Sequence, residues 1–210
     1  VEELRGIDIA NDKITIGAMT RHVDVANDRD LHRALPALAK LAGGIGDPQV
    51  RNRGTIGGSV ANNDPAADYP AALLALQATV STDRRKIKAD EFFVDMFETA
   101  LEDDEVITAV EFPTVDFARY LKFPNPASRY AIVGVFVARR DDEVRVAVTG
   151  AGASVFRFVE AEKALSKSFS VEALNDISCS PDDLNDDLHA RAAYRAELVK
   201  VLTERAVQYD

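Results

Sequence analysis

A glycine-rich segment at residues 43–65 places the strongest limit on how this chain can fold. It holds six of the 11 glycines, together with two prolines and three asparagines. Glycine and proline both disfavour the interior of a helix, so the segment is predicted to be irregular rather than helical. Loops of this length inside a compact domain are usually functional. This segment is therefore the first candidate for a binding site.

The centre of this segment reads GTIGGS over residues 54–59. Adjacent glycines let a backbone approach a ligand closely and adopt positive φ angles, so that successive N–H groups can converge on an anion. Threonine and serine add hydroxyl donors on both sides, and a pyrophosphate group would suit such a loop. The same residues are equally typical of a tight turn between two strands. No GK[ST] sequence follows, so this is not a Walker-type nucleotide loop.

An acidic composition limits the partners of the chain. Lys and Arg number 25 against 35 Asp and Glu, which gives a net charge of −10. Nucleic acids and anionic membranes are therefore not expected partners, because neutralising phosphates needs clustered basic residues. Hydrophobic residues at 47% and charged residues at 29% are typical of a folded globular chain. No apolar run approaches the roughly 20 residues of a membrane span. The first residues do not read as a secretory signal, and a cytoplasmic location is expected.

Metal chemistry is not expected on this chain. Cys179 is the single cysteine, which excludes an intrachain disulfide and an iron–sulfur cluster held by about four thiolates. His22, His32 and His189 lie far apart and match no zinc-binding spacing. The sequence therefore assigns no metal ligand and no catalytic residue.

Short strands and helices are predicted to mix in the first half of the chain. Alternating isoleucines predict strands at 7–9 and 13–18 around an Asn11-Asp12 turn. Thr20 is predicted to cap a following helix, and Pro36 to begin another. The other expected elements are a helix running into a strand at 69–80, and a strand, a helix start and a further strand within 86–112.

Residues 113–117 are the expected boundary between two lobes, 1–114 and 115–210. Beyond it, strand-like runs at 118–123, 130–140 and 143–150 predict a three-stranded antiparallel sheet, with Asp141-Asp142 as a hairpin turn. The remainder reads as helices. The last is expected from about Asp187, with a stripe from Leu188 to Ala206 facing a core. The predicted fold class is α+β.

The run DPQVRNRGTIGGSVANNDPAAD at residues 47–68 resembles the second flavin motif of the molybdenum hydroxylase family. It is similar to the FAD-binding medium subunits of carbon monoxide dehydrogenase and xanthine dehydrogenase type. The upstream sequence IGAMT and the downstream sequences EFP, YLKF and VAVTG match the family in order and spacing. The resemblance therefore covers essentially the whole chain. It implies a PCMH-like second FAD-binding subdomain at 1–114 and a C-terminal domain of sheet and helices at 115–210.

The resemblance also implies roles for individual residues. The GTIGGS residues would wrap the FAD pyrophosphate, and an aspartate would bind the hydroxyl-rich linker of the cofactor. Two isoleucines would pack near its rings, while a lysine and a tyrosine would lie near the flavin. Four of these five residues have plainer readings: the aspartate as a helix cap, the lysine as a solvated side chain and the two isoleucines as ordinary core. The cofactor-binding residues so implied are Ile45, Thr55, Ile56, Gly57, Gly58, Ser59, Asp68, Ile107, Lys122 and Tyr130.

The implied function is electron transfer within a molybdopterin-dependent dehydrogenase. The chain would pass electrons through FAD from iron–sulfur centres on partner subunits to an external acceptor. The implied partners are a large molybdenum-cofactor (molybdopterin) subunit and a small 2Fe-2S subunit, and this chain alone would not be active. Two departures from the family pattern stand out. Ser59 replaces the usual asparagine, and the first flavin motif of an N-terminal subdomain has no match, so FAD binding by the chain alone is expected to be weak or absent.

Two alternative functions remain open. One is a non-flavin scaffold that is a remnant of the same family. The other is a nicotinamide-dependent oxidoreductase that uses the glycines of Gly150–Val155. In that run Val155 stands where close packing of helix and strand needs glycine or alanine. We therefore expect those glycines to mark the exit of a strand from a sheet.

Overall fold

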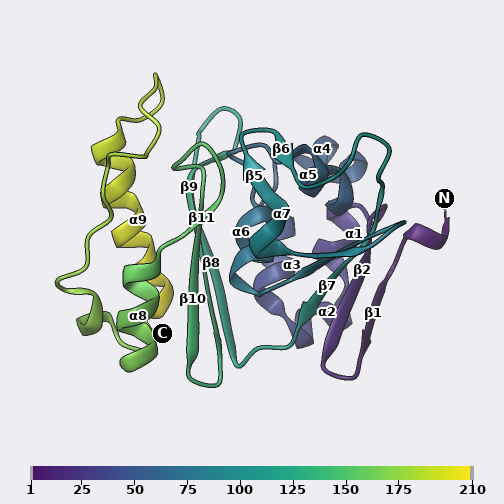
Figure 1. Cartoon of the computed structure of the whole chain (residues 1–210), viewed down its shortest axis with the longest axis horizontal. Helices are drawn as coiled ribbons and strands as arrows, with labels where there is room; N and C mark the ends of the chain where they lie inside the picture. The colour runs from purple at the N-terminus through teal and green to yellow at the C-terminus, as the bar shows by residue number, and fades with distance from the viewer. Residues whose placement is uncertain (1, 209–210) are drawn as a thin grey trace.

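The computed structural model describes residues 2–208, so the first residue and the last two residues of the predicted lobes lie outside it. Two antiparallel β-sheets stand side by side, with helices between them and on the outer face of the second (Figure 1). The first sheet has the strand order β1-β2-β7-β3-β4. Its strands are β1 (Ile7–Ala10), β2 (Lys13–Gly17), β3 (Thr79–Thr82), β4 (Lys86–Lys88) and β7 (Ile107–Pro113).

The predicted hairpin of isoleucines is confirmed as β1 and β2. Ile14 and Ile16 are fully buried, as alternation along a half-buried strand requires. Asn11 and Asp12 have φ angles of 52° and 58°, so the two turn residues are both left-handed. Such a turn matches the twist of the strands that it joins, which explains why asparagine and aspartate occur there.

The second sheet is also antiparallel, with the order β11-β10-β9-β8. Its strands are β8 (Phe117–Pro124), β9 (Ala131–Arg140), β10 (Glu143–Thr149) and β11 (Phe156–Arg157). The predicted three strands are confirmed, and the two-residue strand β11 adds a fourth. Gly150 and Gly152 lie in the connection between the antiparallel strands β10 and β11. They therefore mark the exit from a sheet, as predicted, and not a dinucleotide turn between parallel strands.

The helices divide into two groups. α8 (Val159–Lys167) and α9 (Ala192–Val207) cover the outer face of the second sheet, with a 3₁₀ turn at Val171–Leu174 beside them. The others gather between the sheets and around one end of the first sheet. They are α1 (His22–Asn27), α2 (Arg29–Ala34), α3 (Pro36–Gly43), α4 (Pro48–Arg53), α5 (Ile56–Asn62), α6 (Tyr69–Ala75) and α7 (Ala89–Phe92). A hairpin of β5 (Phe93–Asp95) and β6 (Glu98–Thr99) and a 3₁₀ turn at Glu2–Leu4 complete the fold.

The glycine-rich segment is partly helical, so the prediction that it is irregular rather than helical is wrong for those parts. It forms the short helices α4 and α5, whose starts follow ordinary capping rules. The Asp47 side chain accepts a hydrogen bond from the Val50 N–H, and Pro48 occupies the first helical position. The Thr55 side chain accepts one from the Gly58 N–H in the same way. These caps, together with tertiary packing, outweigh the low helix propensity of the glycines.

Two predicted helix starts are also displaced. Thr20 does not cap α1, because its hydroxyl bonds the backbone of Gly6 instead. The last helix begins at Ala192 rather than near Asp187, and Leu188 is 90% exposed instead of facing the core. Asp187 accepts hydrogen bonds from the N–H groups of His189 and Ala190, a local turn that competes with helix formation. The prediction that Pro36 begins a helix is confirmed.

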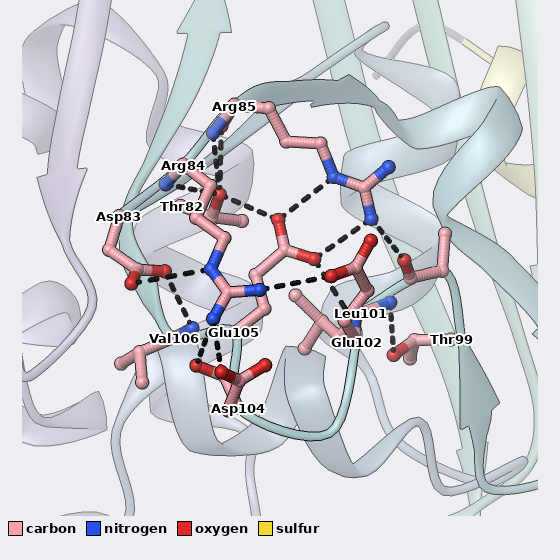
Figure 2. A network of polar contacts seen from close by, with 11 residues as sticks. Thr82, Asp83, Arg84, Arg85, Thr99, Leu101, Glu102, Asp104, Glu105 and Val106 are labelled. Atoms are coloured by element: carbon pink, nitrogen blue, oxygen red, sulfur yellow. Dashed lines mark hydrogen bonds and ion pairs between the residues drawn. The ribbon is translucent and has the colours of Figure 1, made fainter.

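A network of charged side chains fastens the β3–β4 turn to the loop before β7 (Figure 2). Arg85 forms a forked pair with Glu105, with N–O distances of 2.9 and 2.8 Å. Arg84 reaches Glu102 and Asp104 beside it. The Glu105 side chain has no exposed surface, so a buried carboxylate holds the turn and the loop together. Among residues 2–208, no helix is both long enough and apolar enough to cross a bilayer.

Candidate functional site

A cavity of about 680 Å³ opens where α1, α4 and α5, the turn before α6 and the β8–β9 loop meet. This volume lies within the roughly 300–1,000 Å³ of typical ligand pockets. Of the ten residues predicted to bind a cofactor, six line it and four do not. Those that line it are Ile45, Thr55, Gly58, Ser59, Asp68 and Tyr130; Ile56, Gly57, Ile107 and Lys122 do not.

The wall of the cavity is built by pairing two sequence motifs. The His22 N–H donates to the Gly54 carbonyl at 3.0 Å, and the Ile56 N–H donates to Thr20 at 3.1 Å. The Gly57 N–H donates to the Ala18 carbonyl at 2.9 Å. Residues 18–22 and 54–57 thus form a short antiparallel bridge, which sets the position of α5 against the end of β2. Backbone hydrogen bonds between the IGAMT and GTIGGS segments therefore hold each of them in position.

The paired glycines have different roles, and neither has a positive φ angle. A Cβ at Gly57 would lie 2.6 Å from the Ala18 Cβ, so this glycine is required by packing. A Cβ at Gly58 would meet only the Thr55 Oγ1, at 3.1 Å, and this glycine lines the cavity. Ile56 is fully buried. Of the GTIGGS residues, the cavity is thus bordered by Gly54, Thr55, Gly58 and Ser59.

The expected set of free backbone amides is not present. The N–H groups of Ile56 and Gly57 pair with the 18–20 backbone, and that of Gly58 bonds the Thr55 hydroxyl at 3.2 Å. The Ser59 N–H bonds the Thr55 carbonyl. Two arginines that were not among the predicted residues line the cavity instead, Arg53 on α4 and Arg129 in the β8–β9 loop. Positive charge at the cavity therefore comes from side chains rather than from converging amides.

Asp68 lies at one side of the cavity, within a buried cluster. The Tyr120 hydroxyl donates to Asp68 at 2.5 Å, and the Lys122 ammonium lies 2.9 Å from the same carboxylate oxygen. Lys122 also donates to the Gly44 carbonyl at 2.8 Å. Burial raises the pKa of the Asp68 carboxyl, while Lys122 and Tyr120 oppose that shift. Asp68 makes no helix-capping bond and Lys122 is not a solvated residue, so neither plainer reading holds.

Ile45 and Tyr130 both line the cavity, from two separate segments, whereas Ile107 does not. Ile45 follows α3 and is half-buried, and Tyr130 in the β8–β9 loop is 48% exposed. Ile107 begins β7 and is 6% exposed within the first hydrophobic core. Its plainer reading, ordinary core, is what the structure shows.

His22 is a further residue of the cavity that the sequence reasoning did not assign to it. The first residue of α1, it is 4% exposed and its ring lies beside that of Tyr69, with centroids 5.4 Å apart. Burial, with the nearby Arg51 charge, lowers the pKa of its imidazole to about 4. The sequence reasoning considered His22 only as a metal ligand, and spacing along the chain held no sign of its proximity to Gly54. Throughout residues 2–208, no group of acidic, histidine or cysteine side chains is arranged to hold a metal.

Comparisons with known proteins identify relatives of the chain. Residues 1–115 match the family model described as the FAD binding domain in molybdopterin dehydrogenase. The glyceraldehyde dehydrogenase medium chain of Sulfolobus acidocaldarius is 33% identical over 98% of this chain and 79% of its own length. The carbon monoxide dehydrogenase medium chain of Hydrogenophaga pseudoflava is 33% identical over 95% of this chain and 77% of its own. A solved structure of carbon monoxide dehydrogenase from the same organism superposes with a TM-score of 0.84, at 30% identity over 99% of this chain and 78% of that one.

Proposed function

This chain belongs to the family of FAD-binding domains in molybdopterin dehydrogenases, and from that premise we propose that the cavity beside α5 is the FAD site. Its relatives are medium subunits of oxidoreductases, and the chain is an FAD-binding subunit of the same kind. The observation that carries the proposal is the convergence of six predicted residues, from four separate segments, on one cavity.

The residues of the cavity fit a flavin dinucleotide. Gly58 leaves its wall without a side chain, so a ligand can approach the α5 backbone closely. Arg53 and Arg129 offer charge to a pyrophosphate, and the Thr55 and Ser59 hydroxyls offer hydrogen bonds. Ile45 and Tyr130 provide apolar and aromatic surface for a ring system.

FAD, when bound, supplies the capacity to accept and release electrons. The chain's own residues would bind and orient it. Asp68 is held in place by Tyr120 and Lys122, so its carboxylate presents a fixed edge to the cavity. The buried Lys122 ammonium, which does not line the cavity, pairs with this carboxylate and offsets its charge.

We further propose the partners and the path of the electrons. With a single cysteine, the given sequence does not supply the thiolates of an iron–sulfur cluster, which supports delivery of electrons from a partner subunit. The proposed partners are a large molybdenum-cofactor subunit and a small 2Fe-2S subunit, with an external acceptor taking electrons from the flavin. Purification of the tagged chain from its native host tests this. The expected result is recovery of both partners, and recovery of neither contradicts it.

Binding of FAD is the direct test of the site. The chain is titrated against FAD and the flavin fluorescence is followed, with NADH titrated in parallel. Weak one-to-one binding of FAD is expected from this chain, and tighter binding from a version that also carries a first flavin motif. Absence of FAD binding by both versions would support the non-flavin scaffold, and preference of the chain for NADH would support the nicotinamide alternative.

A charge variant locates the site. Gly58→Asp places a carboxylate on the cavity wall and is expected to weaken FAD binding at least tenfold, because it repels the pyrophosphate. Gly43→Asp is the matched control, since Gly43 is also an exposed helical glycine but lies outside the cavity. A Cβ at Gly43 meets only the Ala26 Cβ, at 3.7 Å, so this control should bind FAD like the parent. Equal weakening by both variants would count against the assigned cavity.

A further inference from the structure

We propose that Tyr120 is a positioning residue of the FAD site: its hydroxyl, seated over Gly134, fixes the Asp68 carboxylate at the wall of the cavity. The inference rests on the proposed FAD site and on Asp68 as one of its residues. It adds a residue to which the resemblance assigns no role. It follows from a glycine in a buried strand, from the contacts of the tyrosine and from a neighbouring threonine.

Gly134 interrupts a strand that is otherwise filled with side chains. It lies inside β9, where residues 131–138 are all buried. A glycine in the interior of a strand weakens the strand, and it often marks a place that another group approaches closely. A Cβ at residue 134 would overlap the Tyr120 hydroxyl oxygen and would lie 3.0 Å from Cζ of that ring. The missing side chain therefore provides the space that the tyrosine hydroxyl occupies.

The Tyr120 hydroxyl is held against Asp68 from this space. It donates to the Asp68 carboxylate at 2.5 Å, and its ring stacks on that of Phe136, with centroids 6.0 Å apart. In the sheet, Tyr120 pairs with Phe136 and Lys122 pairs with Gly134, so the glycine is the diagonal neighbour of the tyrosine. Stacking on Phe136 and the space over Gly134 thus set the direction of the hydroxyl.

A threonine on the other side of Gly134 holds the backbone just before Asp68. Thr149 of β10 pairs with Gly134, and a Cβ on the glycine would lie 2.9 Å from Thr149 Cγ2. The Thr149 hydroxyl lies within hydrogen-bond distance of the Pro65 and Ala67 carbonyls, at 3.1 and 2.6 Å. The threonine therefore fixes the chain that leads to Asp68, and the tyrosine fixes the carboxylate itself.

Asp68 can transmit this order to a ligand. It lines the cavity, and its side chain keeps 4% of its surface exposed. An ionised carboxylate has about four acceptor sites, of which Tyr120 and Lys122 use only part. Burial raises the pKa of this carboxyl, and the hydrogen bond from Tyr120 opposes the rise, so the tyrosine favours the charged form. The remaining acceptor capacity suits a hydroxyl of the linker of FAD.

The plainer role of Tyr120 is to join the second sheet to the first lobe, with no effect on the cofactor. The two roles differ once the Asp68 carboxylate is removed. A positioning residue acts on FAD only through that carboxylate, so its substitution then has no further effect on affinity. Substitution of a structural residue that acts independently changes affinity by the same factor in both backgrounds.

The fit of the hydroxyl over Gly134 is tested in the chain itself by urea denaturation. Gly134→Ala should lower the urea midpoint of the parent, because the methyl group overlaps the Tyr120 hydroxyl. It should lower the midpoint less in Tyr120→Phe, where the hydroxyl is gone and the ring remains. An equal fall in both backgrounds would show that the hydroxyl is not seated over the glycine.

The positioning role is tested by a double-mutant cycle on FAD affinity, in the version that also carries a first flavin motif. Tyr120→Phe alone should raise the FAD dissociation constant about tenfold, the scale of one hydrogen bond to a charged group. In the Asp68→Ala/Lys122→Met background, where neither charge is left alone, it should change the constant less than about twofold. Tyr194→Phe is the matched control, because Tyr194 is 49% exposed on α9 and does not line the cavity.

Each outcome of the cycle decides between the two roles. A large effect of Tyr120→Phe in the parent and a small one in the background without Asp68 supports positioning, provided that Tyr194→Phe binds FAD like the parent. Unchanged affinity in Tyr120→Phe, or the same loss in both backgrounds, would overturn the proposal and leave the tyrosine a structural role. A parent that binds no FAD would contradict the proposed function itself, and this inference with it.

Discussion

Asp68 lines the cavity and also forms part of a buried cluster with Tyr120 and Lys122. Tyr120 and Lys122 are two residues apart on β8, so their side chains point to the same face of the second sheet. Both reach the Asp68 carboxylate, which stands at the start of α6. The carboxylate therefore joins the second sheet to the helices of the first lobe, and a change there should be felt even in the absence of a cofactor.

Asp68→Ala is expected to destabilise the cofactor-free protein by about 3–5 kcal/mol, because it leaves the Lys122 ammonium buried without its partner. Urea denaturation measures this loss. Asp68→Ala/Lys122→Met should recover part of it, because neither charge is then left alone. A single variant as stable as the parent would show that the ion pair is not needed for folding.

In the charged network of Figure 2, a single residue, Glu105, makes the stability of the folded protein depend on pH. Hydrogen bonds from Arg85 hold the pKa of Glu105 down, to about 2 from its ordinary 4.5. A carboxylate with a lowered folded-state pKa stabilises the protein above the unfolded-state pKa. That contribution is lost as the pH falls from about 4.5 towards 2.

Glu105→Gln should therefore lower the melting temperature at pH 7 and flatten its decline between pH 5 and pH 2.5. Glu102→Gln is the control, because that side chain belongs to the same network but is 64% exposed. It should behave like the parent at both ends of the range. Parallel pH profiles for the parent and Glu105→Gln would contradict the assignment.

At the scale of elements, helix α5 contains two glycines with different roles. Gly57 is required by packing against Ala18, whereas Gly58 leaves the cavity wall open to a ligand. Gly57→Ala should cost roughly 1–3 kcal/mol of stability, because the added methyl group overlaps the Ala18 Cβ and carbonyl. Gly58→Ala adds the same group to the same helix at an exposed position and should leave stability nearly unchanged. Thermal unfolding of the two variants makes the comparison, and equal losses would contradict the packing argument.

The strands were more predictable than the helices, for physical reasons. The alternation of hydrophobic residues at Ile14 and Ile16 matches the alternating burial along β2, because one face of this strand packs against the core. The helices α4 and α5 were missed because glycine content was given more weight than the caps at Asp47 and Thr55. The local sequence also does not reveal that Ala18 and Gly57 touch, a contact that depends on tertiary packing.

The candidate site was predictable only in part. The GTIGGS resemblance led to a segment that lines the cavity in part, yet Ile56 and Gly57 are buried away from it because their N–H groups pair with residues 18–20. Arg129 and His22 come from distant segments, and nothing in their local sequence marks them as neighbours of Gly54 or Ser59. Whether the ten predicted residues contact FAD stays a prediction.

At the scale of the whole molecule, the two sheets share a core across the predicted boundary. Phe136 and Ala138 of β9 and Ala147 of β10 belong to the same buried cluster as the first sheet and its helices. Figure 1 shows α6 between the two sheets, and it contacts both β9 and β10. The division into lobes at 114 and 115 stays a prediction, and the shared core argues for joint unfolding.

The described fold is therefore expected to unfold in one cooperative transition. Far-UV circular dichroism and tyrosine fluorescence should give coincident urea curves, as two-state behaviour requires. Phe136→Ala should lower the midpoint of both curves together, because it opens a cavity in the shared core. Two separated transitions would instead show that the lobes unfold independently.

Ala18 and Gly57 fill one small space between them, so neither can change alone. A substitution that enlarges one position must be matched by a reduction at the other, because the two Cβ sites would lie only 2.6 Å apart. Across related sequences, the combined size of the two side chains should stay nearly constant, with glycine at position 18 wherever position 57 carries alanine. The IGAMT and GTIGGS motifs are far apart along the chain, but substitutions in one should be accompanied by compensating substitutions in the other.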